Sequence, residues 1–127
     1  MPSGNVVTFI ETKPFSESWE EFELPDEDLQ ALQNLIMRSP RSHPVIPATG
    51  GLRKMRFAPP SWLKGKRGAL RVCFVYFQEY GIVLLTLVYS KREKADLGAD
   101  DKKAIRQLIQ REEKVLSERS TKQRKRP

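Results

Sequence analysis

The sequence has 127 residues, of which 39% are hydrophobic, a formal net charge of +7 at pH 7 and a pI of about 9.8. A chain of this length predicts one domain with one modest core, which excludes a large multidomain enzyme. The lone cysteine, Cys73, excludes an internal disulfide and a cysteine-rich zinc cluster, as expected for a protein of a reducing cytosol.

No stretch of the sequence has the character of a membrane span or an export signal. The longest apolar stretch, Ile82 to Tyr89, is much shorter than the ~20 residues of a membrane helix. The first residues, Met1 to Asn5, have neither the basic start nor the apolar run of a secretion signal. We therefore expect a soluble, cytoplasmic protein that makes no contact with a membrane.

The charge is distributed unevenly along the chain. Residues 1–37 contain eight acidic residues and one lysine, whereas residues 38–127 contain 22 basic and eight acidic residues. A basic majority favours a polyanionic partner, because each neutralised phosphate releases counterions and long-range attraction speeds encounter. An anionic membrane surface is the competing partner, but the sequence has no strongly amphipathic basic helix ending in aromatic residues.

The first third of the chain predicts a strand, a helix and a loop. Val6 to Thr12 is short, β-branched and apolar, which is typical of a strand. A helix is expected from Pro25 to Met37, where acidic residues occupy the first turn and leucines recur at helical spacing. Prolines and a glycine pair indicate a loop over Ser39 to Gly51.

Three strands are expected next, at Leu52 to Ala58, Leu70 to Phe77 and Ile82 to Tyr89. The first two are joined by a loop rich in Pro, Gly and Lys, and the last two by a short turn, so all three should pair antiparallel. The second and third are apolar at odd and even positions alike, which predicts a sheet covered on both faces. The sequence therefore indicates an α+β fold with a small antiparallel sheet.

The C-terminal part predicts a helix followed by a basic tail. The helix should run from about Ala99 to Leu116, where apolar residues form one stripe. The tail, Ser117 to Pro127, holds five basic and few apolar residues, so we expect it to be disordered. The expected organisation is one domain over residues 1–116 and a tail over 117–127.

Basic residues are concentrated around the first predicted hairpin. Strand alternation places Lys54 and Arg56 on one face and Arg53 on the other, and antiparallel pairing would bring Arg71 to the face of Lys54 and Arg56. The segment from Leu52 to Arg71 contains no acidic residue. Its basic residues are Arg53, Lys54, Arg56, Lys64, Lys66, Arg67 and Arg71. This cationic face is either a solvated surface that positions phosphates or a catalytic one.

Three motifs in register resemble the HigB branch of the RelE-type toxins of bacterial type II toxin–antitoxin systems. They are TGGLRKMRF at residues 49–57, GKRGALRV at residues 65–72, and LTLVYSKREKADL at residues 85–97, with Tyr76 between the second and third. The resemblance covers roughly residues 6–115, and Ala48 stands where relatives usually have a glycine. It implies a RelE-like fold of a helix, three strands and a final helix.

The resemblance also implies a function: relatives are ribosome-dependent endoribonucleases that cut messenger RNA, arrest translation and are neutralised by a neighbouring antitoxin. The catalytic residues that it implies are Lys54, Arg56, Arg71, Tyr89 and Lys91. The residues expected to contact RNA are Arg53, Lys64, Lys66, Arg67, Arg92 and Lys94. The sequence leaves open whether Lys91 or Arg92 faces the substrate; a regular strand would place Lys91 with Tyr89.

RNA supplies its own nucleophile, the ribose 2′-hydroxyl, so this chemistry needs no metal, cofactor or covalent side chain. In our hypothesis Arg56 and Arg71 stabilise the charge on the phosphorane, Lys54 assists proton transfer, and Lys91 or Tyr89 positions the nucleotide or donates a proton. The products would be a 2′,3′-cyclic phosphate and a 5′-hydroxyl.

The aromatic residues and the single histidine have two interpretations each. His43 is either an incidental loop residue or a substrate contact, and Trp62 is either packed or inserted against RNA. Four further aromatic residues either pack in the core or stack on RNA bases: Phe74, Tyr76, Phe77 and Tyr80.

The resemblance implies protein partners as well as RNA. They are messenger RNA on the ribosome, with contacts to ribosomal RNA, and a small antitoxin with a helix-turn-helix or a disordered acidic segment. Operator DNA would be contacted only through the antitoxin, and the isolated protein should be monomeric. The alternatives are a non-catalytic RNA- or ribosome-binding module and a degraded phage relative kept for its partner contacts.

Overall fold

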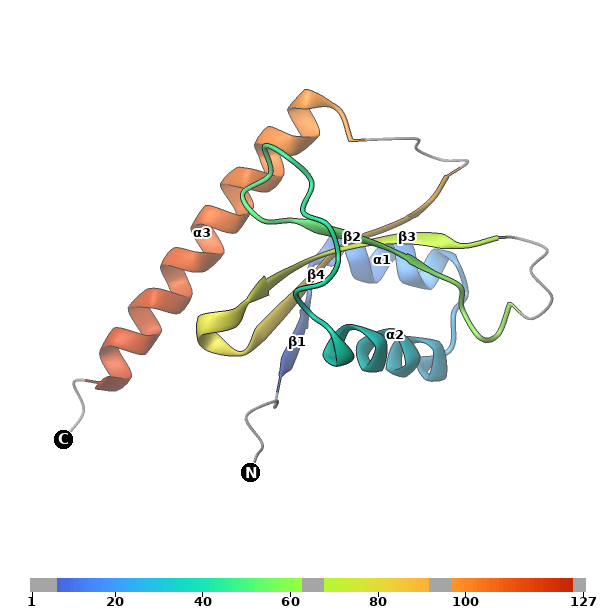
Figure 1. Cartoon of the computed structure of the whole chain (residues 1–127), viewed down its shortest axis with the longest axis horizontal. Helices are drawn as coiled ribbons and strands as arrows, with labels where there is room; N and C mark the ends of the chain where they lie inside the picture. Colours follow the sequence, from blue (N-terminus) through green and yellow to red (C-terminus); the bar gives the residue numbers. More distant parts are fainter. Residues whose placement is uncertain (1–6, 63–67, 92–96, 125–127) are drawn as a thin grey trace.

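A computed structural model of the protein describes residues 7–62, 68–91 and 97–124. It contains four strands, three α-helices and one short 3-10 helix (Figure 1). In chain order these are β1 (Thr8–Glu11), α1 (Lys13–Glu21), α2 (Asp26–Arg38), β2 (Arg53–Phe57), β3 (Leu70–Phe77), η1 (Gln78–Tyr80), β4 (Ile82–Ser90) and α3 (Ala99–Arg124). The α+β class predicted from the sequence is confirmed.

The four strands form one sheet in the order β1-β4-β3-β2. β3 pairs antiparallel with both β2 and β4, as the short connections predict. The outer strand β1 instead pairs parallel with β4, so the sheet is mixed. Nothing in the local sequence dictates that direction, because two α-helices and two strands separate β1 from β4 along the chain.

Both faces of the sheet are covered, as the apolar strands predict. Helices α1 and α2 pack on one face, where Phe15 and Ile36 join Val72 and other residues in a first core. Helix α3 packs on the opposite face, where Ile105 contributes to a second core. In Figure 1 α3 lies apart from α1 and α2, with the sheet between them.

Helix α1 is not among the elements predicted from the sequence, in which the strand over Val6 to Thr12 is followed by a helix only from Pro25. Thr12 caps the helix: its hydroxyl accepts from the Phe15 backbone N–H at 3.1 Å and donates to the carbonyl of Thr86 at 2.8 Å. A cap residue followed by a proline in the first turn is a helix start, and the aromatics at Phe15 and Trp19 lie on one helical face. These signals were present in the sequence.

Helix α3 continues to Arg124, beyond the predicted end at Leu116. The expectation of a disordered tail is therefore wrong for residues 117–124, while residues 125–127 lie outside the described part. The segment has no glycine or proline before Pro127, and its Glu, Arg, Lys and Gln residues favour a helix, so no residue in it ends α3. Within the described residues, no helix is both long and apolar enough to span a membrane.

The loop before β2 contains a residue in a strained backbone conformation. Ala48 has φ of 68°, in the left-handed region that favours glycine. The buried Thr49 holds this turn, because its hydroxyl donates to the Ile46 carbonyl at 2.7 Å and accepts from the Leu52 backbone N–H at 3.0 Å. The turn thus fixes where β2 begins.

We expect Ala48→Gly to stabilise the protein by about 0.5–1 kcal/mol, because relief of the left-handed strain exceeds the added chain entropy of glycine. Urea-induced unfolding followed by circular dichroism measures the change. The matched control is Ala104→Gly on the exposed side of α3, where the same substitution should cost about 1 kcal/mol. Destabilisation by both changes would contradict the interpretation of the loop.

A buried carboxylate ties α2 to the loop that leaves β2. Asp28 is 1% exposed and accepts hydrogen bonds from both the backbone N–H and the hydroxyl of Ser61. The contact joins residues far apart in the sequence. Beside it, the rings of Trp62 and Phe22 pack edge to face with their centroids 6.1 Å apart. Asp28 therefore fixes the exit of the chain from β2.

We expect Asp28→Ala to lower the free energy of unfolding by about 2 kcal/mol, because hydrogen bonds to a charged acceptor are lost and the Ser61 donors stay partly buried. Chemical denaturation is the measurement. The neighbouring exposed Asp26 provides a control, and Asp26→Ala should cost less than about 1 kcal/mol. Equal losses in the two variants would mean that the Asp28 contact adds little.

Candidate functional site

The predicted basic residues of the hairpin lie on one face of the sheet. Arg56 on β2 stands directly opposite Arg71 on β3, and Arg71 stands opposite Tyr89 on β4. Lys54 occupies the next position on the same face, opposite Cys73. We call Lys54, Arg56 and Arg71 the cationic row.

The cationic row is unfavourable for folding by itself. Arg56 is exposed and Arg71 is half-buried, and two like charges directly opposite each other in a sheet repel. Among the described residues, no carboxylate forms a salt bridge with either guanidinium. An anion bound between the two arginines would remove the repulsion, which makes the row a candidate anion site.

The acidic part of the chain lies on the far side of the sheet. Helices α1 and α2 and the turn between them pack on the face opposite α3 and the cationic row. The exposed acids of this segment are Glu17, Glu20, Glu21, Glu23, Asp26 and Glu27. The acidic N-terminal part of the chain therefore faces away from the row, whereas α3, on the row's own side of the sheet, carries the exposed acids Asp100, Glu113 and Glu118.

Tyr89 and Cys73 form the floor beside the cationic row. Tyr89 is 8% exposed, and its side chain forms a hydrogen bond with the Cys73 thiol. Burial raises the pKa of Cys73 to about 11, although that bond and the nearby Lys54 both favour the thiolate. The thiol is therefore protonated at neutral pH. Cys73 is fully buried and packs in the second core, and strand parity with Arg71 places it beside the row.

Lys91 follows the end of β4 and is exposed. Ser90, the last residue of β4, is paired with Leu70, so Lys91 lies at the rim of the sheet near the start of β3. The expected contacts Arg92 and Lys94 lie outside the described residues, as do Lys64, Lys66 and Arg67. The choice between Lys91 and Arg92 therefore stays open.

Arg53 differs from the row, as parity predicts. Its Nη1 donates to the carbonyl of Arg41 at 2.9 Å and to that of His43 at 2.7 Å, so it braces the proline-rich loop. The rings of His43 and Phe74 pack edge to face, with their centroids 5.8 Å apart. Partial burial and the neighbouring Arg53 lower the pKa of His43, which keeps the imidazole neutral at pH 7. His43 adds no charge to the site.

Most of the aromatic residues weighed as base-stacking candidates are packed. Phe74 and Phe77 are buried in the first and second cores, respectively. Trp62, Tyr76 and Tyr80 are partly buried and pack against these cores. Of these candidates, only Trp62, Tyr76 and Tyr80 have exposed ring surface on which a base could stack in this conformation.

Comparison with known proteins places the fold. No protein-family model matches the sequence. Among solved structures, the chain is similar to the Escherichia coli toxin RelE in its free state, in a mutant with two arginines replaced by alanine. The two share 12% sequence identity with a TM-score of 0.50, over 71% of this chain and 88% of the RelE chain. The protein thus has a RelE-like α+β fold.

Proposed function

We propose that the protein is an endoribonuclease toxin that cuts messenger RNA on the ribosome. The observation that supports this most is the cationic row, in which Arg56 and Arg71 face each other without a carboxylate among the described residues. A protein accepts such repulsion where an anion has to be bound, and the RelE-like fold agrees with RNA as that anion. The HigB-like motifs make the HigB branch our proposed subgroup.

In the proposed reaction, the 2′-hydroxyl of the ribose loses its proton and attacks the adjacent phosphorus. Arg56 and Arg71 stabilise the negative charge that builds on the phosphorane oxygens. Lys54 assists removal of the 2′ proton, and the bond to the 5′-oxygen breaks as that oxygen receives a proton from Lys91. The products are a 2′,3′-cyclic phosphate and a 5′-hydroxyl.

Tyr89 has a supporting place in this proposal. Its burial and its hydrogen bond to Cys73 direct the phenol into the floor beneath the row, whereas Lys91 is exposed at the rim. We therefore assign proton donation to Lys91 and positioning to Tyr89. The basic residues that the sequence assigns to RNA contact, in the loop between β2 and β3 and after β4, would hold the RNA backbone.

A protein with this activity needs an inhibitor in the cell that makes it. We propose a cognate antitoxin with a helix-turn-helix or an acidic disordered segment, which would bring the complex to its operator. The free toxin would be monomeric.

A purified translation system tests the proposal. A defined messenger RNA is incubated with the protein, with and without ribosomes, and the RNA ends are mapped. The expected result is cleavage within the open reading frame only when ribosomes are present. Intact messenger RNA in both reactions, from folded protein, would overturn the proposal.

A non-catalytic module that docks on ribosomal RNA is the second candidate. The observation in its favour is the burial of Tyr89, which removes one possible proton donor from the open face. This candidate predicts that the protein inhibits translation without cutting the RNA, so the same reaction distinguishes the two.

A further inference from the structure

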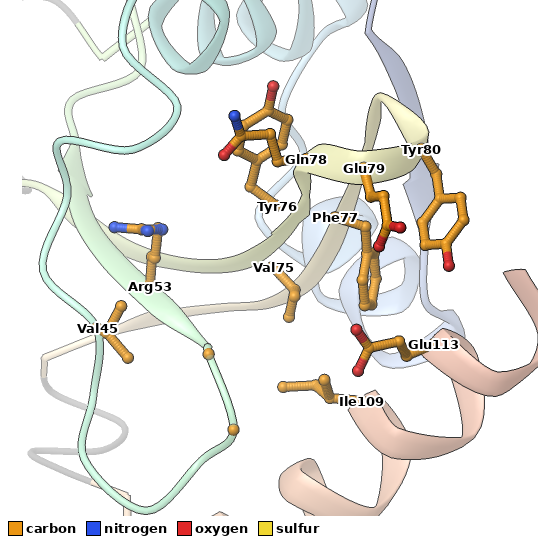
Figure 2. Close-up of a pocket in the computed structure, with 12 residues that line it drawn as sticks. Val45, Arg53, Val75, Tyr76, Phe77, Gln78, Glu79, Tyr80, Ile109 and Glu113 are labelled. Atoms are coloured by element: carbon orange, nitrogen blue, oxygen red, sulfur yellow. The ribbon is translucent and has the colours of Figure 1, made fainter. Parts of the chain in front are cut away.

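A second site lies at the edge of the sheet, where β3 extends beyond β2. Pairing between these strands ends at Arg53 and Phe74, whereas β3 continues to Phe77. The unpaired end of β3 lines a pocket of about 540 Å³, shown in Figure 2. The other walls come from the Val45–Gly51 loop and from α3.

The open edge presents backbone hydrogen-bonding groups. The Lys54 N–H donates to the Pro44 carbonyl at 3.0 Å, on the side of β2 away from β3. In an antiparallel sheet the backbone N–H and C=O groups of successive residues point to alternate sides, so those of Arg53 point toward β3 and those of Phe74 point toward β2. The backbone groups of Tyr76, two residues further along β3, point to the same side as those of Phe74, but β2 does not extend far enough to pair with them. Such an edge is a template for another strand.

The pocket is apolar at its floor and acidic on one side. Val75 and Ile109 lie at its centre in Figure 2, with Glu79 and Glu113 beside Phe77. Val45, which is 45% exposed, lies with Arg53 on the opposite side. An apolar side chain would fill the centre, and a cationic side chain would meet the two carboxylates.

RNA is a poor occupant for this pocket. Two carboxylates line it against one guanidinium, and that guanidinium already donates to two backbone carbonyls. The pocket is also separate from the cationic row, because along β3 the buried Cys73 lies between Val75 and Arg71. The loop there is held to α3 by Arg106, whose Nη1 donates to the Ala48 carbonyl at 3.5 Å.

We propose that this edge binds an extended segment of a partner protein, which adds a strand to β3 and carries an apolar and a basic side chain two residues apart, so that both point to the face of α3. Backbone pairing with Tyr76 would supply affinity, and the pocket would supply selectivity for that side-chain pattern. The inference does not depend on RNA cleavage, because no residue of the cationic row lines the pocket.

The test uses a blocked eight-residue peptide, titrated into the full-length protein, in which every second residue is in turn valine and lysine and the residues between them are threonine. The expected result is a saturable NMR shift of the Tyr76 amide, together with slower hydrogen exchange there. A peptide with glutamate in place of lysine, and one with N-methylated valines, should both bind at least roughly five-fold more weakly. No shift with the lysine peptide, or equal binding of all three, overturns the proposal.

Charge reversal at the pocket provides the matched variants. Glu79→Lys/Glu113→Lys should weaken binding of the lysine peptide roughly five-fold or more, whereas Glu20→Lys/Glu21→Lys on α1 should not. Circular dichroism checks that each variant is folded. Equal effects of the two pairs would indicate nonspecific attraction and overturn the proposal. Two other results would also do so: the same shifts with a single-stranded RNA oligonucleotide, or protection of Tyr76 by a second copy of the chain in concentrated free protein.

Discussion

Replacing Arg56 by alanine is expected to lower the rate of messenger RNA cleavage on the ribosome by about 10²–10³-fold, while the fold stays at least as stable as before. The rate falls because one of the two guanidinium groups that stabilise the negative charge of the phosphorane is lost. Stability is kept because Arg56 is exposed and opposes the like charge of Arg71, so its removal relieves repulsion. Single-turnover cleavage and urea-induced unfolding measure the two quantities.

The double variant Arg56→Ala/Arg71→Ala makes the prediction more specific. If both arginines hold the same phosphate, their losses do not multiply, and the double variant should be little slower than the worse single variant. Arg38→Ala is the control, because Arg38 is exposed at the end of α2, whose helix packs on the far face of the sheet. Multiplicative losses, or an equal loss in the control, would contradict a shared phosphate.

A substrate with a single 2′-deoxyribose on the 5′ side of the scissile phosphate should resist cleavage completely at that bond. The proposed nucleophile is the 2′-oxygen, so its removal leaves nothing for Lys54 to deprotonate and no cyclic product to form. In the unmodified substrate the new 3′ end should be a 2′,3′-cyclic phosphate, identified by mass spectrometry.

Cleavage of the deoxy-substituted bond, or a free 3′-hydroxyl at the cut, would overturn the proposed attack. The ribosome needs magnesium for its own structure, so metal dependence is better tested on the toxin alone. Toxin treated with a chelator and then returned to magnesium-containing ribosomes should retain full activity. A requirement for another added metal would contradict the scheme.

Strand periodicity predicts much of the candidate site from the sequence. Alternation places Lys54 and Arg56 together and Arg53 opposite, and the structure has this arrangement. The apolar character of β3 and β4 at odd and even positions correctly predicts that both faces are covered. What periodicity could not provide is register, because the loop between β2 and β3 is too long to fix it. The partnership of Arg56 with Arg71 therefore required the structure.

The remaining differences depend on contacts between distant parts of the chain. The position of Tyr89 is set by the second core, which α3 and Leu97 complete, and by a register shift in β4 near Thr86. The parallel pairing of β1 is equally non-local. Helix α1 is a different case, because the local signals for its start, Thr12 as cap and Pro14 in the first turn, directly follow the predicted strand.

The central claim is that the cationic row cuts RNA and does more than hold it. The variant Lys54→Ala/Arg56→Ala tests this most directly, with messenger RNA cleavage and ribosome co-sedimentation measured on the same folded protein. We predict that cleavage and growth arrest are lost while most of the protein still sediments with ribosomes. Parallel loss of cleavage and sedimentation would contradict the claim and favour a docking module.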